Sequence, residues 1–205
     1  MLASTCFPYP FPEMSSSIVD LGVARVETTV TRETSEINRL VKTFLSNNLN
    51  MKKIIGLDTE RAMKPGKLTK TVLLQLCDGD HCLIVQLHPY DYVELPLSLF
   101  NFFNLPDFTF VGIGIKKSLM MLESEFGLTC KNAVDIGPAS WYLTKKAAHL
   151  SCKMDDILPT QLPTSPVFED WCTHALSKDQ IKLAVSNAYL AFRIGIFLLA
   201  GFKVY

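Results

Sequence analysis

The sequence has no excess of charge of either sign. Twenty Lys and Arg residues balance twenty Asp and Glu residues, so the formal net charge of the 205-residue chain is zero. Phosphate contacts dominate the affinity of most nucleic-acid-binding proteins, and such proteins usually carry a basic excess. A broadly basic surface is therefore excluded, and any site for phosphate groups has to be a local cluster of Lys and Arg.

The six cysteines lack the paired C-x-x-C spacing that is typical of zinc sites. Cys77 and Cys82 flank the turn "DGDH" and are expected to lie across a hairpin, with His81 between them. A zinc ion would need a fourth ligand, and none is evident. We expect reduced, buried cysteines in an intracellular protein rather than disulfides or a structural metal. No transit or nuclear signal is convincing, so cytoplasm and nucleus both stay open.

The chain also lacks an apolar run of the ~20 residues that a membrane-spanning helix needs. Its most apolar stretch, "IGIFLLAGFKVY", directly follows Arg193, which favours a buried helix end. The first basic residue is Arg25, so the N-terminus has neither the charged region of a signal peptide nor the Arg-rich character of a transit peptide. We therefore expect no membrane association, a loosely ordered tail over residues 1–20, and one domain over residues 21–205.

Hydrophobic periodicity predicts an alternation of strands and helices. An alternating, β-branched segment and then an amphipathic helix with its N-cap near Thr31 or Thr34 come first, and a continuous apolar strand follows. Strands are predicted over 23–31, 52–58, 70–77, 81–88, 108–115 and 131–136, and helices over 37–45, 95–103, 117–126, 139–148 and 177–200. We expect Gly127 and Ser177 to mark helix ends, and a loop over 152–172. This order describes an α/β domain with a mixed central sheet flanked by helices.

Two carboxylates stand one residue apart in "IIGLDTE". Side chains at i and i+2 of a strand point to the same face, so Asp58 and Glu60 are expected side by side at the end of a central strand. Like charges at this separation disfavour each other's ionisation. A cation, a basic side chain such as Arg61 or Lys64, or water must compensate them.

A basic segment, "RAMKPGKLTK", follows this pair directly. It is the best candidate for a local phosphate site, and a solvated surface loop is the alternative. Charge alone does not decide between them. The predicted nucleic-acid-binding side chains are Arg61, Lys64, Lys67 and Lys70.

The order of five segments resembles a known family. "IIGLDTE", "VLLQLC…CLIVQL", "DFTFVGIGIKKSLMMLESEFGL", "AVDI" and "LSKDQIKLAVSNAYLAFRIG" together resemble the Werner-syndrome-type 3′–5′ exonuclease domain. That domain is one of the DnaQ-like (DEDD) exonucleases of the ribonuclease H-like superfamily. The resemblance covers about residues 23–199, and it extends in particular to small plant members such as the RISC-interacting clearing exoribonucleases.

The resemblance implies a two-metal mechanism. In the family, four acidic side chains hold two Mg²⁺ or Mn²⁺ ions, which activate a water and stabilise the leaving oxygen of a phosphodiester. The first motif, D-x-E, matches Asp58 and Glu60. The second motif supplies an Asp at the start of the helix after "GxGI". The third, Y-x-x-x-D, places a water-orienting Tyr and a metal-binding Asp on one face of the last helix.

This chain departs from the family at three of those positions. Ser118 stands where the second-motif Asp is expected, Leu183 where the Tyr is expected, and Asn187 where the last Asp is expected. Two carboxylates leave about two positive charges of a metal pair unbalanced, so we expect at most one Mg²⁺ or Mn²⁺ ion at Asp58 and Glu60, with Asn187 as a weak additional ligand. Leu183 cannot orient a water.

Other acidic residues do not restore the missing charges. Asp135 ends a predicted strand, but family members carry an acidic residue there in addition to the full set. Glu123 and Glu125 lie beyond the first turn of their helix and are expected to point elsewhere. Ser118 is also typical of the N-terminal region of a helix, and we expect Tyr189 to serve packing rather than catalysis.

Two functional hypotheses follow. The first is a catalytically impaired 3′–5′ exonuclease-like domain that acts by binding single-stranded RNA or DNA or, as the neutral charge favours, a protein partner. Such a partner includes a homo-oligomer or a mixed oligomer with an active relative. The second is a weakly active, metal-dependent 3′–5′ exonuclease on RNA or single-stranded DNA that uses Asp58, Glu60 and Asn187. Fold alone does not separate the two, because function resides in the site.

Overall fold

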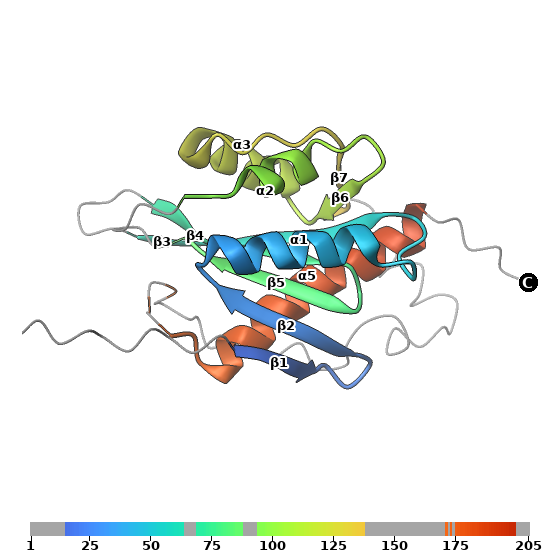
Figure 1. The fold of residues 1–205 in the computed structure, drawn as a ribbon, viewed down its shortest axis with the longest axis horizontal. Coiled ribbons are helices and arrows are strands. Elements are labelled where there is room, and N and C mark those ends of the chain that lie inside the picture. The colour runs from blue at the N-terminus through green and yellow to red at the C-terminus, as the bar shows by residue number, and fades with distance from the viewer. Residues whose placement is uncertain are drawn as a thin grey trace, which may run out of the picture.

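A computed structural model describes residues 15–63, 69–87, 94–137, 171, 173 and 175–199 (Figure 1). Within these residues, seven strands form one mixed sheet in the order β1-β2-β5-β4-β3-β6-β7. β1 and β2 are antiparallel, β2 and β5 parallel, β5, β4 and β3 antiparallel in turn, and β3, β6 and β7 parallel. The strands are β1 (Ser15–Asp20), β2 (Arg25–Thr31), β3 (Ile54–Met63), β4 (Thr69–Cys77), β5 (His81–Gln86), β6 (Thr109–Gly112) and β7 (Ala133–Asp135).

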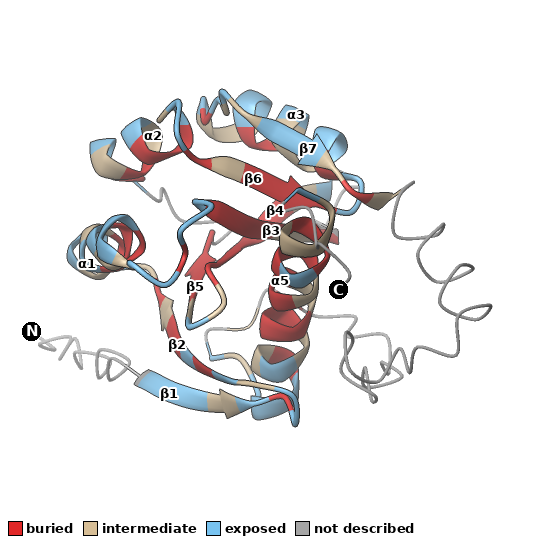
Figure 2. Cartoon of the chain, turned by 90° about the vertical axis from the view of Figure 1, so that its right-hand side faces the viewer, coloured by how far each residue is buried: buried red, intermediate tan, exposed pale blue. Residues whose placement is uncertain are grey.

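Helices cover both faces of this sheet. α1 (Thr34–Ser46), α2 (Leu97–Phe103) and α3 (Ile115–Phe126) share one hydrophobic cluster with one face, and α5 (Lys178–Leu199) packs on the other. Figure 2 shows α1 and α5 on opposite sides of β5, each with its buried side turned to the sheet. The predicted α/β architecture with a mixed central sheet is thus confirmed.

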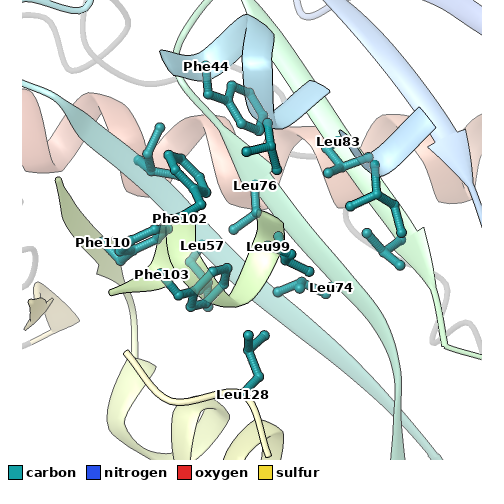
Figure 3. Packing of buried hydrophobic residues seen from close by; sticks show 14 of the residues in the cluster. Phe44, Leu57, Leu74, Leu76, Leu83, Leu99, Phe102, Phe103, Phe110 and Leu128 are labelled. Atoms are coloured by element: carbon teal, nitrogen blue, oxygen red, sulfur yellow. The ribbon is translucent and has the colours of Figure 1, made fainter. Parts of the chain in front are cut away.

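The larger core lies beneath α1, α2 and α3. Phe102 stacks on Phe44 with ring centroids 5.8 Å apart and meets Phe108 and Phe110 edge-on at 5.0 and 5.3 Å. Strand residues of alternating position complete the cluster from below, as Figure 3 shows for Leu57, Leu74, Leu76 and Leu83. This packing holds the middle of β3 rigidly, and the next polar residues of that strand are the predicted site.

Two glycines let α5 cross the sheet closely. A Cβ atom on Gly56 of β3 would lie 2.0 Å from the carbonyl oxygen of Ala188, and one on Gly195 would lie 2.6 Å from Val111. Only glycine fits at such contacts, so β3 and the middle of α5 are forced into van der Waals contact. This close approach brings Asn187 to the carboxylate pair.

α5 also meets, by length and composition alone, the requirement for a membrane-crossing helix, which the sequence analysis expected no segment to meet. Half of its most apolar window is buried in this fold. Ala184, Val185 and Ala188 contribute to the cluster on the sheet face. The helix is therefore used here as a core helix.

Most predicted elements are confirmed, and two details were wrong. Residues 15–20 form β1, which pairs with β2, so that part of the expected tail is ordered. The N-cap of α1 is Glu33, directly before Thr34, as the predicted start of this helix near Thr31 or Thr34 requires. β3 continues to Met63, because β4 pairs with it beyond Glu60. The predicted helix over 139–148 lies outside the described residues, as does all of the predicted loop over 152–172 except Trp171.

Helix ends follow the sequence signals. Gly127 ends α3 in the left-handed conformation with φ 71°, which glycine adopts without strain. Ser177 and Gln180 cap α5 reciprocally: the backbone N–H of Gln180 donates to Ser177 Oγ at 3.2 Å, and the N–H of Ser177 donates to Gln180 Oε1 at 2.8 Å. This capping box fixes the start of the helix that carries Leu183 and Asn187.

Candidate functional site

Asp58 and Glu60 lie side by side on the face of β3 that α5 covers. They occupy alternate positions of the strand, as predicted, but in its interior rather than at its end. β6 pairs only with Ile54–Gly56, so the following residues of β3 have no described strand neighbour on that side. The pair therefore faces a place where the sheet is open next to the first turn of α3.

Burial makes both carboxyl groups weaker acids. Desolvation raises the pKa of Asp58 to about 6, against which hydrogen bonds from the Thr59 backbone and the Asn187 side chain act. Desolvation and the charge of Asp58 raise the pKa of Glu60 to about 7. The protein therefore supplies too little positive charge to balance the two ionised carboxylates, and the pair favours binding a cation or a proton.

Asn187 is the α5 residue that meets this pair. Its Nδ2 atom donates to Oε1 of Glu60 at 3.5 Å, and its side-chain hydrogen bonds lower the pKa of both carboxyl groups. An amide donor thereby supplies part of the positive charge that a cation would supply. The predicted contact of Asn187 with the site is present, and the amide faces Glu60 through its donor atom.

Ser118 is bonded to a residue on the opposite face of β3 from Asp58 and Glu60. Thr59 Oγ1 donates to Ser118 Oγ at 2.8 Å, which ties the first turn of α3 to the strand. Thr59 lies between Asp58 and Glu60 in the sequence, so its side chain points to the opposite face. This contact was not predicted from the sequence, although the middle residue of D-x-E is the natural signal for it.

Leu183 and Tyr189 both serve packing. Leu183 is half-buried against the cluster between α5 and the sheet, and Tyr189 is buried within that cluster. Tyr189 also lies 6.4 Å from the ring of Phe192. The expectation that Tyr189 packs rather than reacts is consistent with this position, and Leu183 presents no polar atom to the carboxylates.

Arg61 forms a polar latch with Glu125 and β4. Its Nη2 atom lies 2.9 Å from Oε1 of Glu125 and donates to the Thr69 carbonyl at 2.7 Å. Nη1 donates to Thr71 Oγ1 at 2.9 Å, and the Thr71 N–H donates to Oε2 of Glu125 at 2.8 Å. Glu125 points to this hairpin, away from the pair, as predicted. The idea that Arg61 neutralises Asp58 or Glu60 was wrong, because its partner is Glu125.

The basic segment is described only in part. Lys70 is half-buried on β4, whereas Lys64 and Lys67 lie outside the described residues. The Arg61 guanidinium is occupied by four hydrogen bonds, namely the three described above and one from Nη2 to Thr69 Oγ1. The role of these four residues in binding nucleic acid stays a prediction.

Asp135 has a structural task. Its Oδ1 atom accepts hydrogen bonds from the backbone N–H groups of Gly114 and Gly137, each at 3.0 Å. These bonds fix the turn that precedes α3. Asp135 thus holds the loop through this oxygen, and the expectation that it does not replace a missing ligand stays a prediction.

The cysteine pair lies at the hairpin of β4 and β5. Cys77 and Cys82 are cross-strand partners at the hairpin, as predicted, and both are buried free thiols. His81 Nδ1 lies 3.4 Å from Asp78 Oδ2, so the turn is held by its own polar groups. Within the described part of the chain, no group of three or more His, Cys, Asp or Glu side chains is arranged to hold a metal.

The oxygen donors near β3 define the chemistry that remains. Asp58 and Glu60 offer carboxylate oxygens, and Asn187 offers an amide, the ligand types that hard ions such as Mg²⁺ and Mn²⁺ prefer. Mg²⁺ is commonly held by one or two carboxylates together with waters and substrate phosphate. This donor set fits one such ion and has too little negative charge for two.

One further polar side chain, not predicted from the sequence, faces this region. Gln75 of β4 lies directly opposite Asp58 in the antiparallel pair. The signal was a polar residue inside the apolar run "VLLQLC", read together with the register that the hairpin turn imposes.

Comparisons with known proteins agree with the fold. The sequence profile described as 3′–5′ exonuclease matches residues 33–199. No protein of curated function matches the chain.

Solved structures resemble the chain at low sequence identity. RNase D from Escherichia coli, an exoribonuclease involved in structured RNA processing, superposes with a TM-score of 0.65 at 17% identity, over 85% of this chain and 45% of that one. The EXO domain of Aedes aegypti Nibbler superposes with a TM-score of 0.58 at 15% identity, over 80% of this chain and 84% of that one. The EXD2 exonuclease domain matches with a TM-score of 0.47 at 20% identity, over 85% and 90%. Because the sequence identities are this low, the structural likeness indicates a shared fold alone.

Proposed function

The chain belongs to the 3′–5′ exonuclease family, whose profile spans residues 33–199, and from this premise we propose that it is a member with impaired hydrolysis that acts by binding. Its metal site has lost two of four carboxylates and the water-orienting tyrosine. The observation that carries the proposal is the 3.5 Å contact of the Asn187 amide with Glu60, at the position where the family motif has its fourth carboxylate. The neutral amide donor there stabilises part of the negative charge that a metal ion would otherwise balance.

Charge balance supports the loss of one metal. Two divalent ions bring four positive charges, and Asp58 and Glu60 return two. Ser118 adds no charge, and its hydroxyl is already bonded to Thr59. When bound, a single Mg²⁺ or Mn²⁺ at Asp58 and Glu60 would supply Lewis-acid polarisation of a phosphoryl oxygen. The leaving oxygen would have no second ion to stabilise it.

The attacking water lacks its orienting group as well. Leu183 stands where the motif has a tyrosine and packs into the core. Losing a general base or an electrostatic stabiliser typically costs about 10²–10⁴-fold in rate, and residues that act as a unit do not contribute additively. The remaining groups of this chain hold at most one ion and bind a strand without activating a nucleophile.

Binding is the activity that such a site retains. The nucleic-acid candidate is single-stranded RNA or DNA, contacted by the basic segment that holds Lys64, Lys67 and Lys70. The protein candidate is a second copy of the chain or an active relative in a mixed oligomer, which the net charge of zero favours. We place the protein inside the cell, in the cytoplasm or nucleus, and consider it akin to the small plant exoribonucleases.

A weakly active exonuclease is the second candidate function. The D-x-E pair is intact, and Asn187 carries an amide oxygen on the same side chain that contacts Glu60. One ion held by these three residues would support slow hydrolysis. The kinship to metal-dependent exonucleases makes Mn²⁺ the ion to test first.

Degradation of labelled single-stranded RNA and DNA in Mg²⁺ and in Mn²⁺ separates the two candidates. Asp58→Ala is the control that removes the last complete motif. Impaired hydrolysis is supported when wild type and Asp58→Ala are equally inactive while the wild type still binds the same strand in fluorescence polarisation. Degradation that Asp58→Ala abolishes favours the weakly active enzyme. Light scattering of the protein alone tests the oligomer.

A further inference from the structure

A glutamine inside the sheet has no partner for its side chain. Gln75 on β4 is fully buried, and neither its Oε1 nor its Nε2 atom has a hydrogen-bond partner. Among the described residues, these are the only buried side-chain polar atoms in that state. Buried polar groups of native proteins are bonded as a rule, and each one that is not lowers stability. An orphan amide at one position points to a partner acquired in another state of the site.

The position of Gln75 identifies that partner. Gln75 and Asp58 are directly opposite in the antiparallel pair of β4 and β3. Opposite residues point to the same face, with Cβ atoms about 4.5–5.5 Å apart. On its other side Gln75 faces Ile84 of β5, which has no polar side-chain atom. The Asp58 carboxyl is therefore the polar group directly within reach.

The helix above contributes one further polar side-chain atom to the cluster on this face. α5 places Ala184, Val185, Ala188 and Tyr189 there, and of these only Tyr189 carries a hydroxyl, to which Gln75 is not bonded. Asn187 is already directed to the carboxylates through its own amide. Gln75 and Asn187 thus flank the Asp58–Glu60 pair from β4 and from α5.

We propose that Gln75 is a positioning residue for a cation held by Asp58 and Glu60. When the pair binds a divalent ion, Nε2 of Gln75 donates to one oxygen of Asp58, which leaves the other oxygen directed to the ion. This inference rests on the proposed function only in taking the pair to hold one ion. A hydrogen bond to an ionised carboxylate is stronger than a neutral one. Residues that orient a metal ligand in this way typically contribute 10–100-fold to metal affinity.

The proposal makes stability and affinity change in opposite directions. Replacing Gln75 by an apolar residue of similar size removes an unsatisfied amide, so the cation-free protein gains stability or keeps it. The same replacement leaves Asp58 free to rotate, so the ion binds less tightly. If the role of Gln75 were purely structural, its replacement would lower the stability of the protein and leave its affinity for the ion unchanged.

Gln86 provides a matched control on the neighbouring strand. It is also buried, with 8% exposure, but its Nε2 atom donates to the Thr173 carbonyl at 3.3 Å. Gln86→Met therefore removes a satisfied amide. It should lower the melting temperature of the cation-free protein and leave ion binding as in the wild type.

The experiment measures Mn²⁺ binding by isothermal titration calorimetry and the melting temperature in chelator, for wild type, Gln75→Met, Gln75→Leu and Gln86→Met. We expect both Gln75 variants to melt at or above the wild-type temperature and to bind Mn²⁺ about tenfold more weakly. Asp58→Asn, measured in parallel, should abolish binding and so assigns the ion to the pair.

Three results would overturn the inference. They are a lower melting temperature in both Gln75 variants, an unchanged Mn²⁺ affinity in both, and a wild type that binds no Mn²⁺. The last result leaves the proposal of impaired hydrolysis intact, because that proposal is judged by degradation of nucleic acid rather than by ion binding. Efficient degradation of nucleic acid by the wild type, together with wild-type Mn²⁺ affinity in Gln75→Met, would reject both the proposal of impaired hydrolysis and the positioning role of Gln75.

Discussion

Asn187 on α5 donates its side-chain amide to Glu60 on β3 across 3.5 Å, and this contact joins the last helix to the carboxylate pair. The amide lowers the pKa of both Glu60 and Asp58, against the larger effect of burial. Position 187 thus stabilises two buried acids without a metal ion. This relationship gives the protein a cation-independent way to stabilise the two buried acids.

Asn187→Asp should destabilise the cation-free protein. The change replaces a donor by a third carboxylate beside two others, and we expect a loss on the order of 1–3 kcal/mol in the free energy of unfolding. Mg²⁺ or Mn²⁺ should restore most of it. Urea unfolding in chelator and in each ion checks this, with the exposed Asn101→Asp as control. Equal stability of Asn187→Asp and wild type in chelator would show that the amide does not compensate the pair.

The weakened acidity of the pair gives a pH dependence with a defined sign. Burial raises the pKa of Asp58 from 3.8 to about 6 and that of Glu60 from 4.5 to about 7, so between these values the folded state binds more protons than the unfolded state. The stabilisation is fully present below about pH 4 and is lost as the pH rises through 6 and 7. A tenfold difference in acidity between the folded and unfolded states corresponds to about 1.4 kcal/mol.

The Asp58→Asn, Glu60→Gln double variant removes this dependence. In chelator, the free energy of unfolding of the wild type, relative to this variant, should fall by on the order of 5 kcal/mol between about pH 4 and pH 8. Urea unfolding at several pH values measures the difference. A relative stability that rises with pH would mean that the carboxylates are compensated in the folded protein.

The latch of Arg61 and Glu125 should contribute more to stability than an exposed ion pair. Glu125 accepts from Arg61 and from the Thr71 backbone, and both side chains are largely buried. Glu125→Gln should cost about 1–3 kcal/mol. Asp107→Asn, which breaks the exposed pair with Lys53, should cost at most about 1 kcal/mol. Similar costs in chemical denaturation would contradict the buried role of the latch.

Gly56→Ala should be severely destabilising. Its Cβ would lie 2.0 Å from the Ala188 carbonyl and 2.6 Å from the Phe192 nitrogen, both backbone atoms that cannot move alone. We expect a loss of more than about 3 kcal/mol, at the upper end for overpacking. Ala62→Gly on the same strand is the control, at a cost of about 1 kcal/mol. A Gly56→Ala protein as stable as wild type would mean that α5 does not cross β3 at this distance.

Local signals in the sequence were sufficient for much of the fold and of the site. Alternation placed Asp58 and Glu60 on one strand face, helical spacing placed Asn187 on the last helix, and Gly127 marked a helix end. Each of these depends on residues close together in the chain. Their mutual contact depends on Gly56 and Gly195, whose role appears only when α5 is docked on the sheet.

Contacts between distant segments could not be predicted. The strand over residues 15–20 begins with three serines and exists because β2 offers it an edge. β3 extends past Glu60 through Arg61, Ala62 and Met63, since β4 pairs with it across a register shift that skips Val72. The partner of Arg61 is 64 residues away, and nothing near Glu125 indicates it.

The degradation rate of a restored site tests the central claim most directly. Ser118→Asp, Leu183→Tyr and Asn187→Asp together return the missing carboxylates and tyrosine, and the rate on labelled single-stranded RNA or DNA in Mn²⁺ is compared with that of wild type. We expect the triple variant to degrade the strand at least about 10²-fold faster than the wild type, and Asp58→Ala in the triple variant to abolish the gain. A wild type that degrades as fast as the triple variant, through Asp58, would contradict the account.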